Sequence, residues 1–150
     1  MGQFRKLLDP QGSRGFKSLS HRKYDLMKIT SQKNAKNFKS PEGREAWIYL
    51  FPECEFQYDE QQPQTALKWH HHEKIWEMIY VIEGELVAKW KENGKIRKRI
   101  VKAGDLVEPG FVSHTFENRS DKIVKFIAVK FVLSGEDKSE IIEKDKYYDE

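Results

Sequence analysis

The chain has 150 residues, of which 34% are charged and 13% are aromatic, and its formal net charge is +3. This length suits one domain with a buried core, and the aromatic content is too high for a disordered protein. Its single cysteine excludes an intrachain disulfide, and no apolar stretch approaches the ~20 residues of a membrane helix. We expect a soluble cytoplasmic protein without a signal peptide.

Charge is distributed unevenly along the chain. Residues 1–40 contain ten Lys or Arg and two Asp, whereas residues 134–150 contain seven acidic residues and three lysines. The basic segment lacks interleaved aromatic residues and any nucleic-acid module, so we expect a solvated or partner-packed arm and no nucleic-acid partner. The predicted parts are a basic N-terminal arm at 1–23, a barrel domain at 24–133 and an acidic tail at 134–150.

Short apolar runs between turn residues predict many strands. The expected strands are one that begins near Tyr24 and those at 46–51, 75–81, 86–90, 96–101, 106–108, 113–117 and 123–133. Asn93-Gly94 is the strongest hairpin signal, because both residues tolerate the positive φ angles of a tight two-residue turn. The segment Glu60-Gln61-Gln62-Pro63-Gln64 is expected to be a polar loop that precedes the histidines.

The last predicted strand, 123–133, has apolar residues on both faces, so both faces must be covered. Many short strands with regularly spaced turns indicate a closed barrel or a double-sheet jelly roll, and we predict an all-β fold. In the acidic tail, Ser134 is placed to cap a short helix that carries Ile141, Ile142 and Tyr148.

Four of the five histidines fall in two short stretches that read as strand. Successive side chains of a strand point to opposite faces, so His70 and His72 project together while His71 points away. A bend before the next strand would bring Glu77 beside them, and His114 would complete the set from a third strand. This clustering predicts a metal site formed by His70, His72, Glu77 and His114.

Such a set of nitrogen and oxygen ligands suits iron(II), manganese, nickel, copper or zinc. An ion that accepts six ligands would keep two positions open for substrate or dioxygen, and an open position separates a catalytic site from a structural one. The ion could polarise a carbonyl or hold a deprotonated hydroxyl, and iron or copper could also activate oxygen.

The order His70-x-His72, Glu77 and Gly84, followed by Gly104, Pro109, His114 and Asn118, resembles the paired motifs of the cupin superfamily. The first motif matches in full. In the second, four residues separate the glycine from the proline where the family has five, and Phe111 stands at the usual glycine position. We interpret this as a tightened turn that leaves His114 in place. The resemblance covers about 69–132 and implies a cupin-type double-stranded β-helix with this metal site.

Cupins include dioxygenases, sugar isomerases, decarboxylases, storage proteins and ligand-sensing domains, so the fold does not choose among these functions. The leading hypothesis is a metal-dependent enzyme of the dioxygenase or isomerase type that acts on a small oxygen-rich molecule. The second is a non-catalytic module that binds a carbohydrate or metabolite. The third is a metal-free nucleotide-sugar isomerase or epimerase, against which the intact His-x-His and Glu set argues.

One face of the strand at 75–81 is strongly apolar. It carries Trp76, Met78, Tyr80 and Ile82, opposite to the face of Glu77. Such a surface is rarely left in water. Either the N-terminal strand or a second subunit would cover it, and since small cupins often dimerise in this way we expect a homodimer.

Other polar and aromatic residues have open interpretations. Phe116 shares a face with the third histidine and could form the floor of the pocket, although core packing is the simpler interpretation. Glu108 could be a base near the site or a surface carboxylate. We expect His71 to lie behind the site or exposed, His21 to be solvated in the arm, and Asn118 to be a turn residue.

Overall fold

The computed structural model describes residues 27–132 and 139–149. Contacts divide the chain into a part that ends at Thr30 and a part that begins at Ser31, and the second part contains the described regular elements. These are η1 (Gln32–Asn34), β1 (Lys36–Lys39), β2 (Arg44–Leu50), β3 (Cys54–Gln61), β4 (Thr65–Ala66), β5 (His70–His71), β6 (Trp76–Glu83), β7 (Glu85–Glu92), β8 (Lys95–Lys102), β9 (Leu106–Val107), β10 (His114–Asn118), β11 (Val124–Phe131), α1 (Ser139–Lys144) and β12 (Tyr147–Tyr148). The arm at 1–23 and the strand expected near Tyr24 lie outside the described residues.

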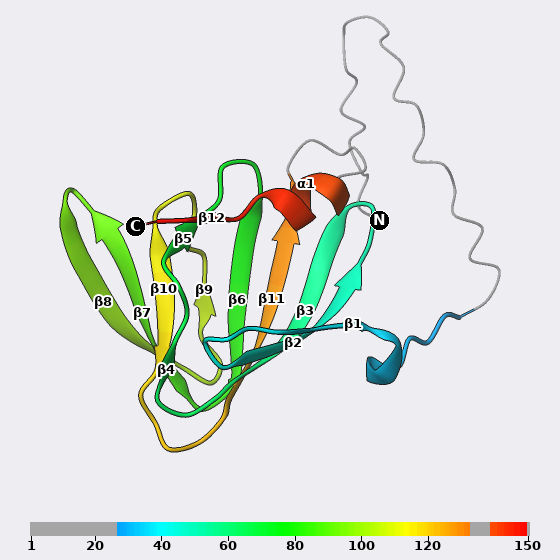
Figure 1. Cartoon of the computed structure of the whole chain (residues 1–150), viewed down its shortest axis with the longest axis horizontal. Helices are drawn as coiled ribbons and strands as arrows, with labels where there is room; N and C mark the ends of the chain where they lie inside the picture. The colour runs from blue at the N-terminus through cyan, green and yellow to red at the C-terminus, as the bar shows by residue number, and fades with distance from the viewer. Residues whose placement is uncertain (1–26, 133–138, 150) are drawn as a thin grey trace, which may run out of the picture. The chain divides into compact units, whose positions relative to one another are not determined.

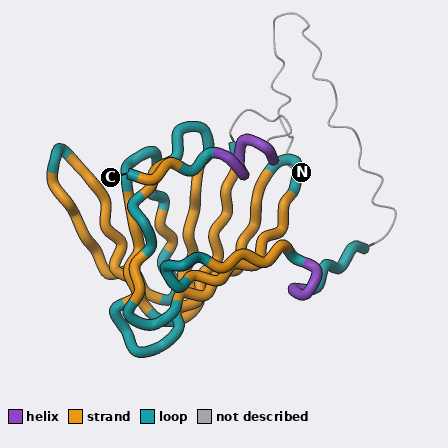
Figure 2. The backbone as a smooth tube through the Cα atoms, viewed as in Figure 1, coloured by secondary structure: helices purple, strands orange, loops and turns teal. Residues whose placement is uncertain are grey.

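The strands form two antiparallel sheets, which confirms the predicted all-β fold (Figure 1). The first sheet has the order β1-β2-β3-β11-β6-β9, and the second has the order β12-β5-β10-β7-β8, with β4 also paired to β10. Loops and turns join the strands at the two ends of the sheets (Figure 2). At one end, α1 and β12 cross over the strands, so the end of the chain lies against the sheets rather than apart from them (Figure 1).

The apolar core lies on strands of both sheets. Its buried members are Ile79, Val81, Leu86, Ala88, Val101, Phe116, Val124, Phe126 and Ala128. They alternate with exposed or half-buried residues along β6, β7 and β11, as expected for strands with one face toward a core. Full burial of a large side chain of this kind stabilises a fold by about 1.5–3 kcal/mol, so these strands supply most of the apolar stabilisation.

Strand β3 also alternates between buried and less buried residues, but its buried side chains are polar. Its buried side chains are Glu55, Gln57, Asp59 and Gln61, while Phe56 and Tyr58 on the other face are only half-buried. The prediction of a polar loop from Glu60 was wrong in its first two residues, which belong to β3. Pairing with β2 and β11 along its whole length holds this polar strand in the sheet.

Two other local predictions can be compared with the structure. The hairpin at Asn93-Gly94 is confirmed, since these residues have φ angles of 50° and 72° and join β7 to β8. The tail does contain a helix, in which Ile142 is buried, but Tyr148 pairs in β12 instead of extending that helix. The proposed cap at Ser134 lies outside the described residues.

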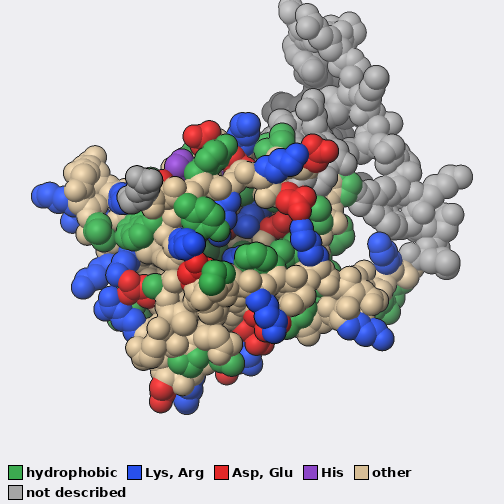
Figure 3. Space-filling model, in the orientation of Figure 1, with side chains coloured by type: hydrophobic (Ala, Val, Ile, Leu, Met, Phe, Trp, Pro, Cys, Tyr) green, Lys and Arg blue, Asp and Glu red, His purple; other side chains and the backbone are tan. Residues whose placement is uncertain are grey.

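The surface of the β7–β8 hairpin is rich in basic side chains (Figure 3). Strand β8 has the sequence KIRKRIVK, and every residue except Val101 is exposed. Because β8 lies at the edge of its sheet, these lysines and arginines also discourage pairing with another strand. In the described ranges, the structure contains no helix that is long and apolar enough to cross a membrane.

Candidate metal centre

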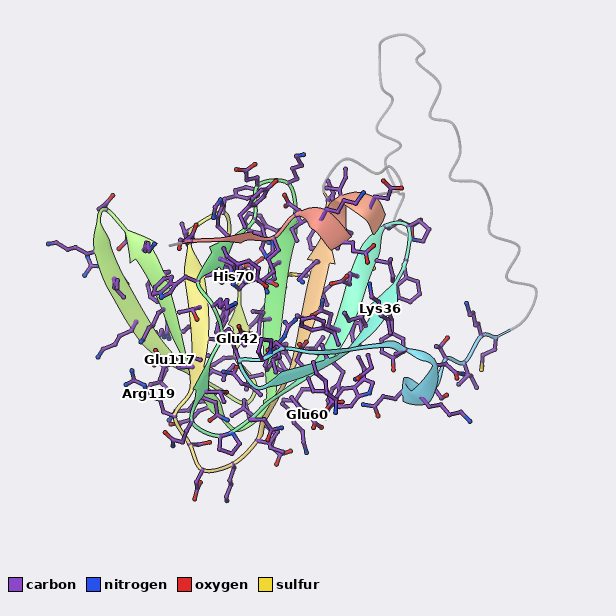
Figure 4. The ribbon with its side chains drawn as sticks, in the orientation of Figure 1. Lys36, Glu42, Glu60, His70, Glu117 and Arg119 are labelled. Carbon is purple, nitrogen blue, oxygen red and sulfur yellow. The ribbon has the colours of Figure 1, made fainter. Side chains whose placement is uncertain are left out.

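The four predicted metal ligands converge between the two sheets. His70 lies in β5, His72 directly follows it, Glu77 is near the start of β6 and His114 begins β10. Their potential ligand atoms all lie within 4.8 Å of one another, and all four residues are buried. Antiparallel pairing places His70 opposite His114, and Figure 4 shows His70 near the end of the sheets that β12 crosses. The pairing of β5 with β10 therefore brings together in space two histidine motifs that are far apart in the sequence.

Each of the three imidazoles is held by a backbone carbonyl. Nδ1 of His70 lies 2.9 Å from the oxygen of Lys68, and Nδ1 of His114 lies 2.8 Å from that of Val112. Nδ1 of His72 lies 2.5 Å from the oxygen of Asp145. A carbonyl oxygen can only accept, so Nδ1 is the protonated nitrogen in each ring and Nε2 carries the lone pair. All three rings thus offer Nε2 as a ligand atom.

The arrangement of Nε2 and carboxylate atoms fits a cation. Nε2 of His114 lies 3.2 Å from Oε2 of Glu77, and Nε2 of His72 lies 3.6 Å from the same oxygen. Nε2 of His72 is buried and has no hydrogen-bond partner in the described structure. Lone pairs that face one another at such distances repel unless a proton or a metal ion lies between them. Metal–ligand bonds of about 2.0–2.2 Å place neighbouring ligand atoms at similar separations.

Charge states in the cluster also suit metal binding. Burial, together with the nearby Lys146 charge, lowers the pKa of His70 to about 2, so this imidazole is neutral at physiological pH. Burial by itself would raise the pKa of Glu77, but the adjoining His114 and His72 rings and the charge of Lys130 outweigh it and hold the pKa well below its ordinary value. A neutral imidazole and an ionised carboxylate are the forms that bind a metal ion.

Glu77 is linked on its other side to a row of buried charges. In the first sheet, Lys130 of β11 lies directly opposite Glu77 of β6 and also opposite Glu55 of β3. Its Nζ lies 3.9 Å from Oε1 of Glu77 and 3.3 Å from Oε1 of Glu55. Opposite charges on neighbouring strands attract each other across the sheet. Glu77 therefore presents Oε2 to the imidazoles while Oε1 faces Lys130.

Further charged residues extend this row away from the histidines. Nη1 of Arg44 lies 3.3 Å from Oδ1 of the fully buried Asp59, whose pKa burial raises to about 6 against the opposing charges of Arg44 and Lys130. Lys146 follows α1, and burial together with the like charges of Arg44 and Lys130 lowers its pKa to about 7. The inner surface beside the candidate metal centre thus combines cations and carboxylates at close range.

A cavity of about 640 Å³ reaches the centre at His114. Its lining includes the apolar side chains Ala88, Val101, Leu106, Val107, Pro109, Val112 and Phe116. Arg99 and Glu108 are among its charged residues. Phe116 packs edge-on against the His114 ring, with centroids 5.8 Å apart, so the prediction that it forms the floor beneath this histidine is consistent with the structure.

The tightened turn of the second motif leaves His114 beside the other candidate ligands, as predicted. Gly110 adopts a φ of +63°, and Phe111 packs edge-on against Trp76 with ring centroids 5.6 Å apart. Glu108 lines the cavity and accepts a hydrogen bond of 3.0 Å from Nε1 of Trp76, so it is neither isolated nor remote from the pocket. The aromatic pair thus occupies the space beside the shortened turn.

The remaining predictions for polar residues concern His71, Asn118 and His21. His71 points away from the cluster as expected, and its Nδ1 lies 2.8 Å from Oδ1 of Asp149. The prediction that Asn118 is a turn residue was wrong: it is the buried last residue of β10, and its amide donates to the carbonyl oxygens of Gln61, Gln62 and Lys122. Residue His21 lies outside the described residues.

Sequence reasoning missed the polar residues that surround the four ligands. They are Arg44, Glu55, Gln57, Asp59, Lys130, Asp145 and Lys146. The alternation in 54–61 is a usable strand signal, but the usual rule would place its acidic and amide side chains in water. No feature of the sequence around Asp145 predicts its contacts, because the residues it bonds are about seventy residues away in sequence.

Comparison with known proteins identifies the fold. Residues 57–130 match the family model described as "Cupin domain". The search of curated proteins found no match.

Several solved structures are similar in fold. One is a sugar phosphate isomerase from a cupin superfamily from Silicibacter pomeroyi, with 17% identity and a TM-score of 0.58 over 69% of this chain and 75% of that chain. Another is a predicted oxalate decarboxylase from Thermotoga maritima, with 23% identity and a TM-score of 0.60 over 71% of this chain and 100% of that chain. A variant of oxalate decarboxylase from B. subtilis has 18% identity and a TM-score of 0.62 over 79% of this chain and 31% of that chain. At these identities the similarity shows the fold alone.

Proposed function

The chain contains a small cupin domain, and on this premise we propose that it is a metal-dependent enzyme of the dioxygenase or isomerase type that acts on a small oxygen-rich molecule. His70, His72, Glu77 and His114 would hold a divalent transition metal ion. The observation that carries the proposal is the convergence of three Nε2 lone pairs and one ionised carboxylate, with each Nδ1 held by a backbone carbonyl.

The protein residues perform three tasks in this proposal. The carbonyls of 68, 112 and 145 fix the imidazole orientation, so little reorganisation accompanies metal binding. Glu77 supplies one negative charge through Oε2, while Lys130 holds its other oxygen. The cavity beside His114 gives a ligand access to the centre. A bound ion could polarise a carbonyl or a hydroxyl of that ligand, and iron or copper could also support chemistry with dioxygen.

The surrounding charges favour a negatively charged ligand. Three basic residues near the centre, Arg44, Lys130 and Lys146, lie among four acidic groups, Glu55, Asp59, Glu77 and Asp145. A divalent ion would therefore leave an excess of positive charge inside the protein. The solved structures named for oxalate and for sugar phosphate concern ligands that are both oxygen-rich and anionic, and they support this choice of class.

Metal content tests the proposal directly. Protein purified without added metal should contain near-stoichiometric iron, manganese, nickel, copper or zinc by plasma mass spectrometry. His72→Ala should lower the metal content and weaken metal affinity by at least about 100-fold, because it removes a ligand atom. His21→Ala is the matched control, since this histidine is remote in sequence from the candidate ligands. A parent protein without metal, even after reconstitution, would contradict the proposal.

Activity assays then separate the reaction types. Metal-loaded protein should be incubated with oxalate and with aldose and ketose phosphates, while dioxygen consumption and product formation are measured. Turnover of an anion that is lost in His72→Ala would support the enzyme. Tight binding of one of these anions without turnover would instead indicate the non-catalytic binding module.

We also propose a homodimer formed through the outer face of the first sheet. Tyr80, 44% exposed, and Leu106, 56% exposed, lie opposite one another on β6 and β9 of that face. Half-buried aromatic side chains of β2, β3 and β11 continue the surface: Trp47, Tyr49, Phe56, Tyr58 and Phe131. Exclusion of water from so broad an apolar surface favours association.

Light scattering at micromolar concentration should therefore give twice the mass of one chain. Tyr80→Glu should shift the mass toward the monomer, because it places a charge within the proposed interface. Ile96→Glu, on the exposed edge strand β8, should leave the mass unchanged. A parent protein of monomer mass would remove this part of the proposal.

A further inference from the structure

The last described residues, 145–149, lie against the loop between the first candidate ligands, and we call them the C-terminal clamp. The N–H of Asp145 donates to the carbonyl of Ile141 at 2.9 Å, so α1 sets the position of the clamp. The carbonyl of Asp145 accepts the Nδ1–H of His72. Its carboxylate oxygen Oδ2 accepts three successive backbone N–H groups, those of Glu73, Lys74 and Ile75, at 3.2, 2.9 and 3.1 Å.

The rest of the clamp reaches the strands of the other two histidines. Strand β12 pairs with β5, which places Tyr148 opposite His70 (Figure 1). Asp149 accepts a hydrogen bond from the hydroxyl of Ser113, the residue before the third histidine. The N–H of Asp149 also donates to the carbonyl of Trp69 at 3.1 Å. The clamp therefore contacts every segment that supplies a candidate imidazole ligand.

We propose that the C-terminal clamp is part of the metal centre and that Asp145 is the positioning residue that aims His72 at the ion. This inference rests on the proposed metal site. Residues 73–76 connect His72 to Glu77, so an anchor on three of their four residues sets the distance between these two ligands. Asp145 is 3% exposed and its hydrogen bonds join it to the loop and to His72, so it acts through both of them.

Coupling of this kind must be reciprocal. If docking of the clamp raises metal affinity by some factor, metal binding raises the stability of the docked clamp by the same factor. The N–H of Asp149 reports docking, since it donates to the carbonyl of Trp69, whereas the N–H of Asp145 bonds to Ile141 of α1. Metal should therefore slow hydrogen exchange at the amide of Asp149, which lies outside the set of candidate ligands.

The experiment compares full-length Asp145→Ala, Asp145→Asn and the control Glu140→Gln. Glu140 belongs to the same C-terminal segment, but its side chain is 89% exposed and pairs with the exposed Lys144. The measurements are the dissociation constant for cobalt(II) by competition with a chelator, the visible spectrum of the cobalt form, and hydrogen exchange of residues 73–75. Circular dichroism verifies that each variant is folded.

We expect Asp145→Ala to raise the cobalt dissociation constant about 10-fold, the lower end of the usual effect for groups that orient a metal ligand, because it removes the carboxylate that anchors the loop but keeps the carbonyl that accepts from His72. The cobalt spectrum should change, and the amides of 73–75 should lose protection. Asp145→Asn should fall between Asp145→Ala and the parent, because an amide oxygen can still accept part of these hydrogen bonds. Glu140→Gln should match the parent in all three measurements.

Two negative results are distinguishable. A parent protein that binds no cobalt would overturn the proposed metal site itself. A parent that binds cobalt, with an Asp145→Ala variant that loses amide protection but keeps the parent dissociation constant and spectrum, would overturn only the role of the clamp. Failure of Asp145→Ala to fold would leave Asp145→Asn and the metal-dependent exchange of Asp149 to decide the matter. Unchanged exchange at Asp149 on metal addition would then count against the inference.

Discussion

Strands β3 and β7 lie in opposite sheets, and β3 buries every second residue along its length while β7 does so only over its first half, but the two bury opposite kinds of side chain. The inner face of β7 contributes Leu86 and Ala88 to the apolar core, whereas that of β3 contributes Glu55, Gln57, Asp59 and Gln61. The candidate metal centre lies where these surfaces meet, since Glu77 faces the imidazoles through one oxygen and the charges of the first sheet through the other. The comparison indicates that one half of the interior stabilises the fold and the other sets the charge around the site.

Energetic reasoning supports this division. A buried polar atom without a hydrogen-bond partner costs about 1–3 kcal/mol. In the described structure, Oδ2 of Asp59 and the amide oxygens of Gln57 and Gln61 have no such partner, and Oδ1 of Asp59 has only its ion pair with Arg44. Apolar residues at these positions would stabilise the protein more. We therefore interpret the inner face of β3 as a requirement of the site rather than of folding.

Lys130→Met should give the largest effect on stability, a loss of about 3–5 kcal/mol at pH 8. The change removes the cation between Glu55 and Glu77 and leaves both carboxylates buried. The loss should be smaller at pH 5, where Asp59, whose pKa is about 6 and which Lys130 also opposes, is protonated, and a second substitution, Glu55→Gln, should recover part of it. Urea unfolding at the two pH values measures these differences.

Leu86→Ala is the matched variant on the apolar side. It should cost about 2–5 kcal/mol through the cavity it creates, equally at pH 5 and pH 8, because no ionisable group is involved. Equal pH dependence of the losses in Lys130→Met and Leu86→Ala would show that the charges of the first sheet do not act as a separate region.

Asp59→Asn should have the next largest effect, and it should be stabilising. The folded-state pKa of Asp59 is about 6 against an ordinary value of 3.8, so the folded protein binds this proton more tightly than the unfolded chain. Parent stability therefore falls as pH rises from about 4 to about 6, by up to about 3 kcal/mol. Asn removes this slope, so the variant should match the parent near pH 4 and exceed it at pH 8. An unchanged slope in urea unfolding between pH 4 and pH 8 would contradict the role of Asp59.

The sequence predicted the site better than its surroundings, for a physical reason. His70, His72 and Glu77 lie within eight residues of one another, so strand geometry alone groups them, and the second motif points to His114. For β3, the polarity of the residues gives the wrong prediction of burial, because the usual rule places acidic and amide side chains in water. Pairing with β2 and β11 overrides that preference, and it depends on residues far away in sequence. The contacts of Asp145 with the histidine loop are non-local in the same way.

Arg97→Gln should have the smallest effect on the free energy of unfolding. It tests whether burial explains the larger effects of the other substitutions. Nε of Arg97 lies 3.0 Å from Oε2 of Glu92 in the β7–β8 hairpin, and both side chains are at least half exposed. Water and salt screen this pair, so its loss should cost only about 0–0.5 kcal/mol in urea unfolding, and high salt should reduce even that. Lys130→Met also removes one positive charge from an ion pair, but within the barrel. If Arg97→Gln cost as much as Lys130→Met, the number of charges rather than their burial would explain the results, and the distinction between the inner charged surface and the exposed hairpin would fail.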